Sequence, residues 1–169
     1  MEKFLNGDFF NPTKGNLKIN QVIGEILDYI QEKPENSYEV IIGCDSSSGE
    51  DPHFPVVTVI LRKGEGGRFF LKKISYKNRK FYYWKERILE EVLLSCEFAL
   101  FLREKLQEEI NKLSFLPNFE FKYIHADIGG AGQTKDAVKE LTGLIRGNGF
   151  EPKIKPESFA ASNVADRFT

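Results

Sequence analysis

Residues 40–47 read VIIGCDSS, an apolar run that stops at an acid followed by serines. A short apolar run bounded by polar turn residues is typical of a strand buried on both faces of a sheet. Open α/β sheets keep their sites at the carboxyl ends of such strands, which is where Asp45 stands. We therefore expect a central strand that presents Asp45 as a functional carboxylate; the alternative is an Asp that caps a turn.

The segments that follow this strand predict the rest of an α/β fold. Residues 55–62 (PVVTVILR) and 68–76 (RFFLKKISY) predict two strands joined by a hairpin-type connection, so that the first three strands form an antiparallel meander. Beyond them we expect a helix over 84–113, a strand over 119–127, a helix over 135–146, a strand over 151–155 and a helix over 159–168. The order βββαβαβα predicts a mixed sheet covered by helices.

The first 36 residues predict an N-terminal arm and a helix packed on this body. Residues 1–16 mix aromatics with Asn, Pro and Gly, and residues 17–31 have apolar positions at helical spacing. A length of 169 residues is one domain's worth, so we expect a single domain over 1–169. No apolar stretch reaches the roughly 18 to 20 residues that a bilayer requires, and nothing reads as a signal peptide. We expect a cytoplasmic protein without membrane segments.

Glu91 is the most informative acid of the long predicted helix. At about 100° per residue, Phe98 and Leu102 lie within about 20° of it, so Glu91 stands in an apolar stripe. A buried ionised Glu is costly unless it is paired or binds a metal, which favours a functional role over a salt bridge with Arg87. The remaining acids of this helix lie about 100° to 140° away and predict a solvated face. They are Glu86, Glu90, Glu97, Glu104 and Glu108.

Asp127 closes the predicted strand 119–127, and the alternative reading is an acid in a loop that enters a helix. The topology can place the strands of Asp45 and Asp127 side by side, with Glu91 on the intervening helix reaching the same point. Three carboxylates within about 5 Å repel by roughly 3 kcal/mol per pair at an effective dielectric near 20, so they require a divalent cation or proton uptake. All-oxygen ligation favours Mg²⁺ or Mn²⁺, and paired ions of this kind promote phosphodiester hydrolysis.

A basic segment points to nucleic acid. Residues 62–87 hold ten Lys or Arg against two acids, although the net charge of the chain is −1. Interleaved aromatic residues add stacking partners for bases, whereas the alternative is a solvated strand-and-loop face. The candidate nucleic-acid contacts are Lys72, Lys73, Arg79, Lys80 and Trp84, with Lys155 in the EPKIKP stretch. His125, two residues before Asp127, is a candidate for proton transfer, but a hydrogen-bonded structural histidine is the favoured reading.

Several longer motifs carry a family resemblance. They are FNPTKG, IIGCDSS, RILEE, HADIGGAGQT, GFEPKIKPESFAAS and ADRFT. These blocks, spread over nearly the whole chain, closely resemble the YkuK-type family of uncharacterised, ribonuclease H-like proteins. The resemblance implies a ribonuclease H-like five-stranded mixed sheet in the order 3-2-1-4-5 with helices on both faces, plus the N-terminal helical extension.

The resemblance also implies a set of metal ligands. In the ribonuclease H-like superfamily, acids on the first strand, the first long helix and the fourth strand, plus one near the last helix, hold two metal ions. Asp45, Glu91 and Asp127 match the first three places, and Asp166 is the candidate for the fourth; the alternative for Asp166 is a surface acid.

We therefore predict a Mg²⁺- or Mn²⁺-dependent nuclease that acts on RNA, DNA or a hybrid, with Asp45, Glu91, Asp127 and Asp166 as catalytic metal ligands. The second hypothesis is a non-catalytic module of the same fold that binds nucleic acid or a protein. A small-molecule phosphohydrolase is the third.

Overall fold

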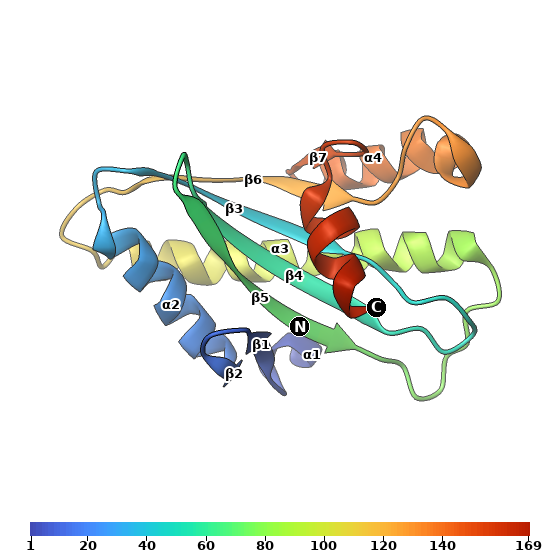
Figure 1. Ribbon diagram of the computed structural model, residues 1–169, viewed down its shortest axis with the longest axis horizontal. Helices are drawn as coiled ribbons and strands as arrows, with labels where there is room; N and C mark the ends of the chain where they lie inside the picture. Colours follow the sequence, from blue (N-terminus) through green and yellow to red (C-terminus); the bar gives the residue numbers. More distant parts are fainter.

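A seven-stranded mixed sheet forms the body of the protein (Figure 1), in the order β2-β1-β5-β4-β3-β6-β7. The computed structural model describes residues 1–169, except for the side chains of Gln133 and Thr134. The strands are β1 (Phe9–Asn11), β2 (Gly15–Leu17), β3 (Ser37–Cys44), β4 (Phe54–Arg62), β5 (Gly66–Ile74), β6 (Asn118–Ala126) and β7 (Glu151–Lys153). β3, β4 and β5 form the expected antiparallel meander, and β6 and β7 add parallel strands beside β3.

The prediction of a five-stranded sheet was wrong in number, because the N-terminal arm contributes two short strands. β1 and β2 form a hairpin that pairs with β5 through Phe10 and Leu71. Three-residue strands are too short to show an alternation of apolar and polar residues, so the sequence gives them no signal. Without this hairpin the strands run β5-β4-β3-β6-β7, which is the relative order 3-2-1-4-5 within the larger sheet.

Helical segments cover both faces of the sheet. They are α1 (Glu2–Leu5), α2 (Ile19–Glu32), α3 (Trp84–Ile110), α4 (Val138–Gly147) and the shorter turns η1 (Gly132–Ala137), η2 (Ala160–Ala165) and η3 (Asp166–Phe168). The main hydrophobic core lies between the sheet and the helices α2, α3 and α4. A smaller core lies on the opposite face, where η2 packs on β3 and β4. Figure 1 shows the segment η2–η3 in front of the sheet and α3 behind it.

Two predicted helices differ from the structure in their geometry. The expected helix over 135–146 divides into the 3-10 turn η1 and the regular helix α4. The expected final helix over 159–168 is a π-helical turn followed by a 3-10 turn. Apolar spacing predicts a helical segment but not its pitch, and π-helical turns occur often at functional sites.

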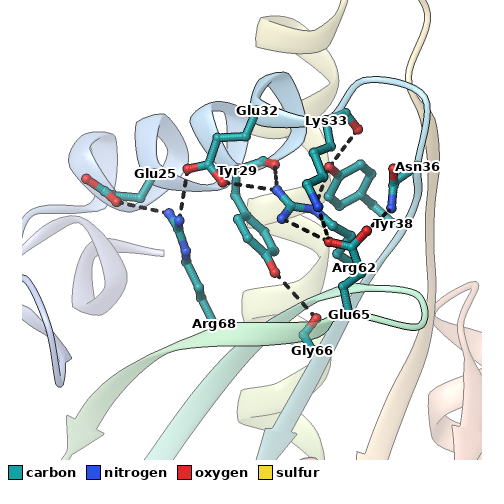
Figure 2. Close-up of polar contacts among 10 residues, drawn as sticks. All are labelled: Glu25, Tyr29, Glu32, Lys33, Asn36, Tyr38, Arg62, Glu65, Gly66 and Arg68. Carbon is teal, nitrogen blue, oxygen red and sulfur yellow. Dashed lines mark hydrogen bonds and ion pairs between the residues drawn. The ribbon is translucent and has the colours of Figure 1, made fainter.

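A buried arginine, Arg62, joins α2 to the end of β4 (Figure 2). Arg62 is paired with Tyr38 near the start of β3, so it lies at the opposite end of that strand from Asp45. The side chain of Arg62 is 8% exposed, and its guanidinium lies 3.9 Å from the ring centre of Tyr29. It donates hydrogen bonds to the hydroxyl of Tyr38 at 2.9 Å, to the carbonyl of Tyr29 at 2.7 Å and to the carboxylate of Glu32 at 3.0 Å. This part of the basic segment is therefore structural.

Replacing Arg62 with Met is expected to lower the free energy of unfolding by about 2 to 4 kcal/mol. The substitution keeps apolar volume but removes the donors to Tyr38 and Tyr29 and a desolvated cation–π contact. Urea unfolding measures the loss. The matched control is Glu65→Gln, which removes a partly exposed ion-pair partner of Arg62 and is expected to change stability by less than about 1 kcal/mol. Equal stability of the two variants would contradict the structural role of Arg62.

Candidate active site at the ends of β3 and β6

Two of the predicted acids leave neighbouring parallel strands at the same level. Cys44 of β3 is paired with Ala126 of β6, so that Asp45 and Asp127 follow a matched pair of residues. Adjacent strands lie about 4.8 Å apart, which brings both carboxylates to one edge of the sheet. Both residues are partly buried.

Glu91 reaches the same edge from α3. Its residue is 6% exposed, and the hydroxyl of Ser46 donates a hydrogen bond of 2.5 Å to Glu91 Oε1. Burial raises the pKa of Glu91 to about 8; the Ser46 hydrogen bond opposes the shift, and the negative charges of Asp45 and Asp127 add to it. Glu91 therefore retains a proton at neutral pH in the protein without a bound cation.

Asp45 lies close to Asp127, which follows the neighbouring strand, and to Asp166 of the C-terminal segment. Burial raises its pKa to about 6, the Ser46 backbone N–H opposes the shift, and the nearby charges of Asp127 and Asp166 raise it further. Asp166 is exposed at the start of η3, on the face of the sheet opposite α3. Asp45 thus interacts electrostatically with Asp127 and Asp166, and Glu91 interacts with Asp45 and Asp127.

The C-terminal segment packs closely on β3, and this packing brings Asp166 near the strand end that carries Asp45. A Cβ atom on Gly43 would lie 2.7 Å from the carbonyl carbon of Ala160, so that only glycine permits this approach of η2 to β3. The backbone N–H of Ala160 donates a 3.1 Å hydrogen bond to His125 Nδ1. Burial, followed by the charge of Lys153, lowers the pKa of His125 to about 4, so the ring is neutral. His125 fastens the segment, in agreement with its structural reading.

Lys155 is the cation nearest to Asp127. Its Nζ lies 3.1 Å from Asp127 Oδ1, and its backbone N–H donates to the carbonyl of Ile128 at 2.9 Å. The ammonium is close enough for an ion pair, but it is not aligned as a hydrogen bond: Asp127 Oδ1 is buried and has no hydrogen-bond donor among the side chains that the structure describes. Lys155 therefore offsets part of the negative charge of the site.

The carboxylate oxygens of Asp45, Glu91, Asp127 and Asp166 are the type of ligand that a hard divalent cation prefers, but they are too far apart in this structure to surround one. Among the residues with described side chains, no group of three or more His, Cys, Asp or Glu is positioned to hold a metal ion. The fit rests on oxygen ligands alone, on the buried Asp127 Oδ1, which has no donor among the described side chains, and on two carboxyls, Asp45 and Glu91, whose pKa values burial raises.

Intramolecular partners occupy four of the six predicted nucleic-acid contacts. Lys72 is buried and donates to the Asn6 carbonyl, Arg79 pairs with Glu90, Lys80 with Asp51 and Lys155 with Asp127. The sequence shows how many cations a segment has, but it does not show which acids from other segments pair with them in the fold. Lys73 is exposed on the sheet face of Asp45, two strands away, and Trp84 is partly exposed at the start of α3.

The sequence analysis missed the roles of two residues of this region, one on α3 and one after β3. Glu90, assigned to a solvated face, is buried: it accepts hydrogen bonds from Tyr76 and, at 2.6 Å, from Arg79. The loop that carries Tyr76 and Arg79 folds over a helix face that sequence periodicity predicts to be open. Ser46, whose hydroxyl donates a hydrogen bond to Glu91, was noted in the sequence only as part of the serine run after Asp45. Its position directly after the strand that carries Asp45 could have indicated that it lies in the site.

Comparisons with known proteins agree with this architecture. In the part of the chain that the structure describes, no helix has the length and hydrophobicity to cross a bilayer. The sequence model of a family described as Ribonuclease H-like matches residues 21–169. The chain is 32% identical over 168 residues to the uncharacterized protein YkuK of Bacillus subtilis (strain 168), a match that covers 95% of this chain and 96% of that protein. No solved structure matches the chain significantly. The sheet with its acidic edge, the family match and the similarity along the whole length show that the chain is a YkuK-type member of the ribonuclease H-like family.

Proposed function

We propose that the protein is a divalent-cation-dependent nuclease that hydrolyses phosphodiester bonds of RNA or DNA at the carboxyl ends of β3 and β6. The observation that carries the proposal is that Asp45 and Asp127 follow paired residues of β3 and β6, while the buried Glu91 of α3 interacts electrostatically with both. Burying carboxyl groups beside one another disfavours their ionised forms, and a divalent cation would offset that cost. Family membership supports a nucleic-acid-related activity.

Asp45, Glu91 and Asp127 would hold Mg²⁺ or Mn²⁺, with Asp166 as a fourth ligand. Bound cations of this kind supply an aligned water and stabilise the attacking and leaving oxygens. Ser46 orients the carboxyl of Glu91 through its hydrogen bond. Lys155, held beside Asp127, places a positive charge where a phosphate would otherwise meet only acids. The neutral ring of His125 keeps the segment of Asp166 on the sheet.

Lys73 is the cation best placed to guide the strand into this site. Its partner across the ladder is Pro55, whose carbonyl accepts the backbone N–H of Asp45 at 3.4 Å. Lys73 and Asp45 are therefore two strands apart on one face, a separation of about 10 Å. An exposed ammonium at this distance can neutralise a phosphate next to the one that reacts.

The test is cleavage of labelled single-stranded RNA, duplex DNA, RNA/DNA hybrid and branched DNA with Mn²⁺, Mg²⁺ or EDTA. We expect cleavage of at least one substrate with Mn²⁺ or Mg²⁺ and none with EDTA, because the acids alone cannot activate water beside a phosphodiester. The panel also identifies the substrate class. Cleavage that persists in EDTA would refute the proposed chemistry.

A second candidate function, a non-catalytic binding module, is favoured by one observation: Lys155 already pairs with Asp127, and no group of described side chains is positioned for a metal ion. Such a module would bind nucleic acid with an affinity that falls with salt and does not depend on Asp45. Binding without turnover on all four substrates would support it over the nuclease.

A further inference from the structure

We infer that Tyr82 and Tyr83 form a stacking platform that selects single-stranded nucleic acid for the acidic site. The inference rests on the proposed function and names its substrate class. The two tyrosines are 65% and 68% exposed, at the turn that leads into α3. Rings with this exposure can stack on the faces of successive bases, an interaction that every base permits.

The aromatic residues that precede the platform, Tyr76 and Phe81, stabilise the fold instead of facing a ligand, because their rings are packed against other side chains. Phe81 is 2% exposed, with its ring centre 5.0 Å from that of Phe54 and 5.8 Å from that of Tyr76. The guanidinium of Arg79 lies 4.4 Å from the Phe81 ring and pairs with Glu90 of α3. This cluster anchors the segment just before Tyr82, so the exposure of the tyrosines is not that of a loose loop.

The backbone of the platform is also held in place. Glu86 Oε2 accepts the backbone N–H groups of Tyr82 at 3.1 Å and of Tyr83 at 3.3 Å. Both rings are thus presented from a backbone fixed to the first turn of α3. A preorganised surface loses little conformational entropy when a ligand binds.

Cations flank the platform and suit a phosphate backbone. Lys77 and Lys85 are exposed, and neither has an ion-pair partner among the described side chains. The ammonium of Lys85 lies 5.6 Å from the ring centre of Trp84, beside the tyrosines. Positive charge interleaved with stacking rings is the combination that single-strand-binding surfaces use. A purely apolar protein partner would gain nothing from these lysines.

The platform lies close to the acids. The backbone N–H of Phe81 donates to the carbonyl of Glu50 at 2.9 Å, and Lys80 pairs with Asp51, so that the loop of the platform is fastened to the loop that follows Asp45. Figure 1 shows both loops together at the end of the molecule to which β3 leads. Along α3, the eight residue steps from Tyr83 to Glu91 span about 12 Å. That distance corresponds to roughly three or four stacked nucleotides.

This arrangement favours a single strand over a duplex. A base can stack on a tyrosine only if its face is open, and in a duplex the faces are covered by neighbouring base pairs. A strand held by its bases on Tyr82 and Tyr83 would extend its backbone along the lysines toward the acidic edge. Duplex substrates would offer only their phosphates.

The test measures binding in EDTA, where no cleavage is expected. Fluorescence anisotropy of labelled 12-nucleotide oligouridine and oligothymidine, and of a 12-base-pair duplex, is compared for the wild type, a Tyr82→Ala/Tyr83→Ala variant and a Tyr82→Phe/Tyr83→Phe variant. We expect the wild type to prefer the single strands, the Ala variant to bind them at least about tenfold more weakly, and the Phe variant to bind as the wild type does.

Three results would overturn the platform. They are unchanged binding by the Ala variant, a preference of the wild type for the duplex, and a wild-type dimer that binds no oligonucleotide and becomes a monomer when the tyrosines are removed. The last would identify a protein interface instead. Tyrosine-dependent binding of single strands without metal-dependent cleavage would leave the platform standing and refute the nuclease, so the two failures are distinguishable.

Discussion

Replacing Asp45 with Asn is expected to reduce metal-dependent cleavage by about a thousandfold or more. Asp45 stands at the centre of the acidic edge, next to Asp127 and Asp166 and within the electrostatic reach of Glu91. A neutral amide loses the charge that would bind a cation but keeps the shape of the side chain. The stabilisation that a metal ion gives to a transition state is several kcal/mol, and each 1.4 kcal/mol is a factor of about ten in rate. Initial rates with Mn²⁺ on the best substrate measure the effect.

The matched control for this variant is Asp28→Asn, which removes the same charge from an exposed position of α2. We expect wild-type cleavage from the control. The melting temperature of Asp45→Asn in EDTA should not fall below that of the wild type, because burial already disfavours the charged form of Asp45. Cleavage by a folded Asp45→Asn variant at the wild-type rate would remove Asp45 from the active site.

The order of the core elements follows from local patterns. β3 has an apolar run with turn residues after it, and α3 has an apolar stripe that repeats over several turns, so both were recognised within a few residues of their bounds. The N-terminal hairpin was missed because its strands have three residues each and take their stability from β5. The close packing of η2 on Gly43 is a tertiary contact, and no local sequence pattern contains it.

In the candidate site, too, some residues could be predicted from local sequence and others could not. Asp45 and Asp127 were found because each closes an apolar strand, and Glu91 because an ionised acid in an apolar stripe is costly. The pairing of Lys155 with Asp127 was not foreseen, since it depends on how the loop after β7 returns to the strand end. The ion pairs within the basic segment were not foreseen for the same reason: Arg62 pairs with Glu32, Arg79 with Glu90 and Lys80 with Asp51, acids that lie outside the segment.

The pH dependence of stability offers a second large effect, which involves Glu91. Its pKa rises from an ordinary 4.5 to about 8 on folding, so the folded protein holds a proton that the unfolded chain releases. This contribution to stability is fully present below about pH 4.5 and is lost as the pH rises toward 8. The loss across that interval is on the order of 4 kcal/mol, since each pH unit is worth about 1.4 kcal/mol. In EDTA, Glu91→Gln should lack this loss, because a neutral amide has no proton to release.

Urea unfolding of the two proteins in EDTA at pH 4.5 and pH 8 measures the difference. Relative to the wild type, Glu91→Gln should gain about 4 kcal/mol between these two values, whereas Glu104→Gln, an exposed acid on the same helix, should gain nothing. Mn²⁺ at pH 8 supplies the positive charge that Glu91 lacks, so it should raise the melting temperature of the wild type and have little effect on Glu91→Gln. A wild type whose stability follows that of Glu91→Gln at both pH values, with equal responses to Mn²⁺, would show that Glu91 is ionised without a cation and is not a member of the metal site.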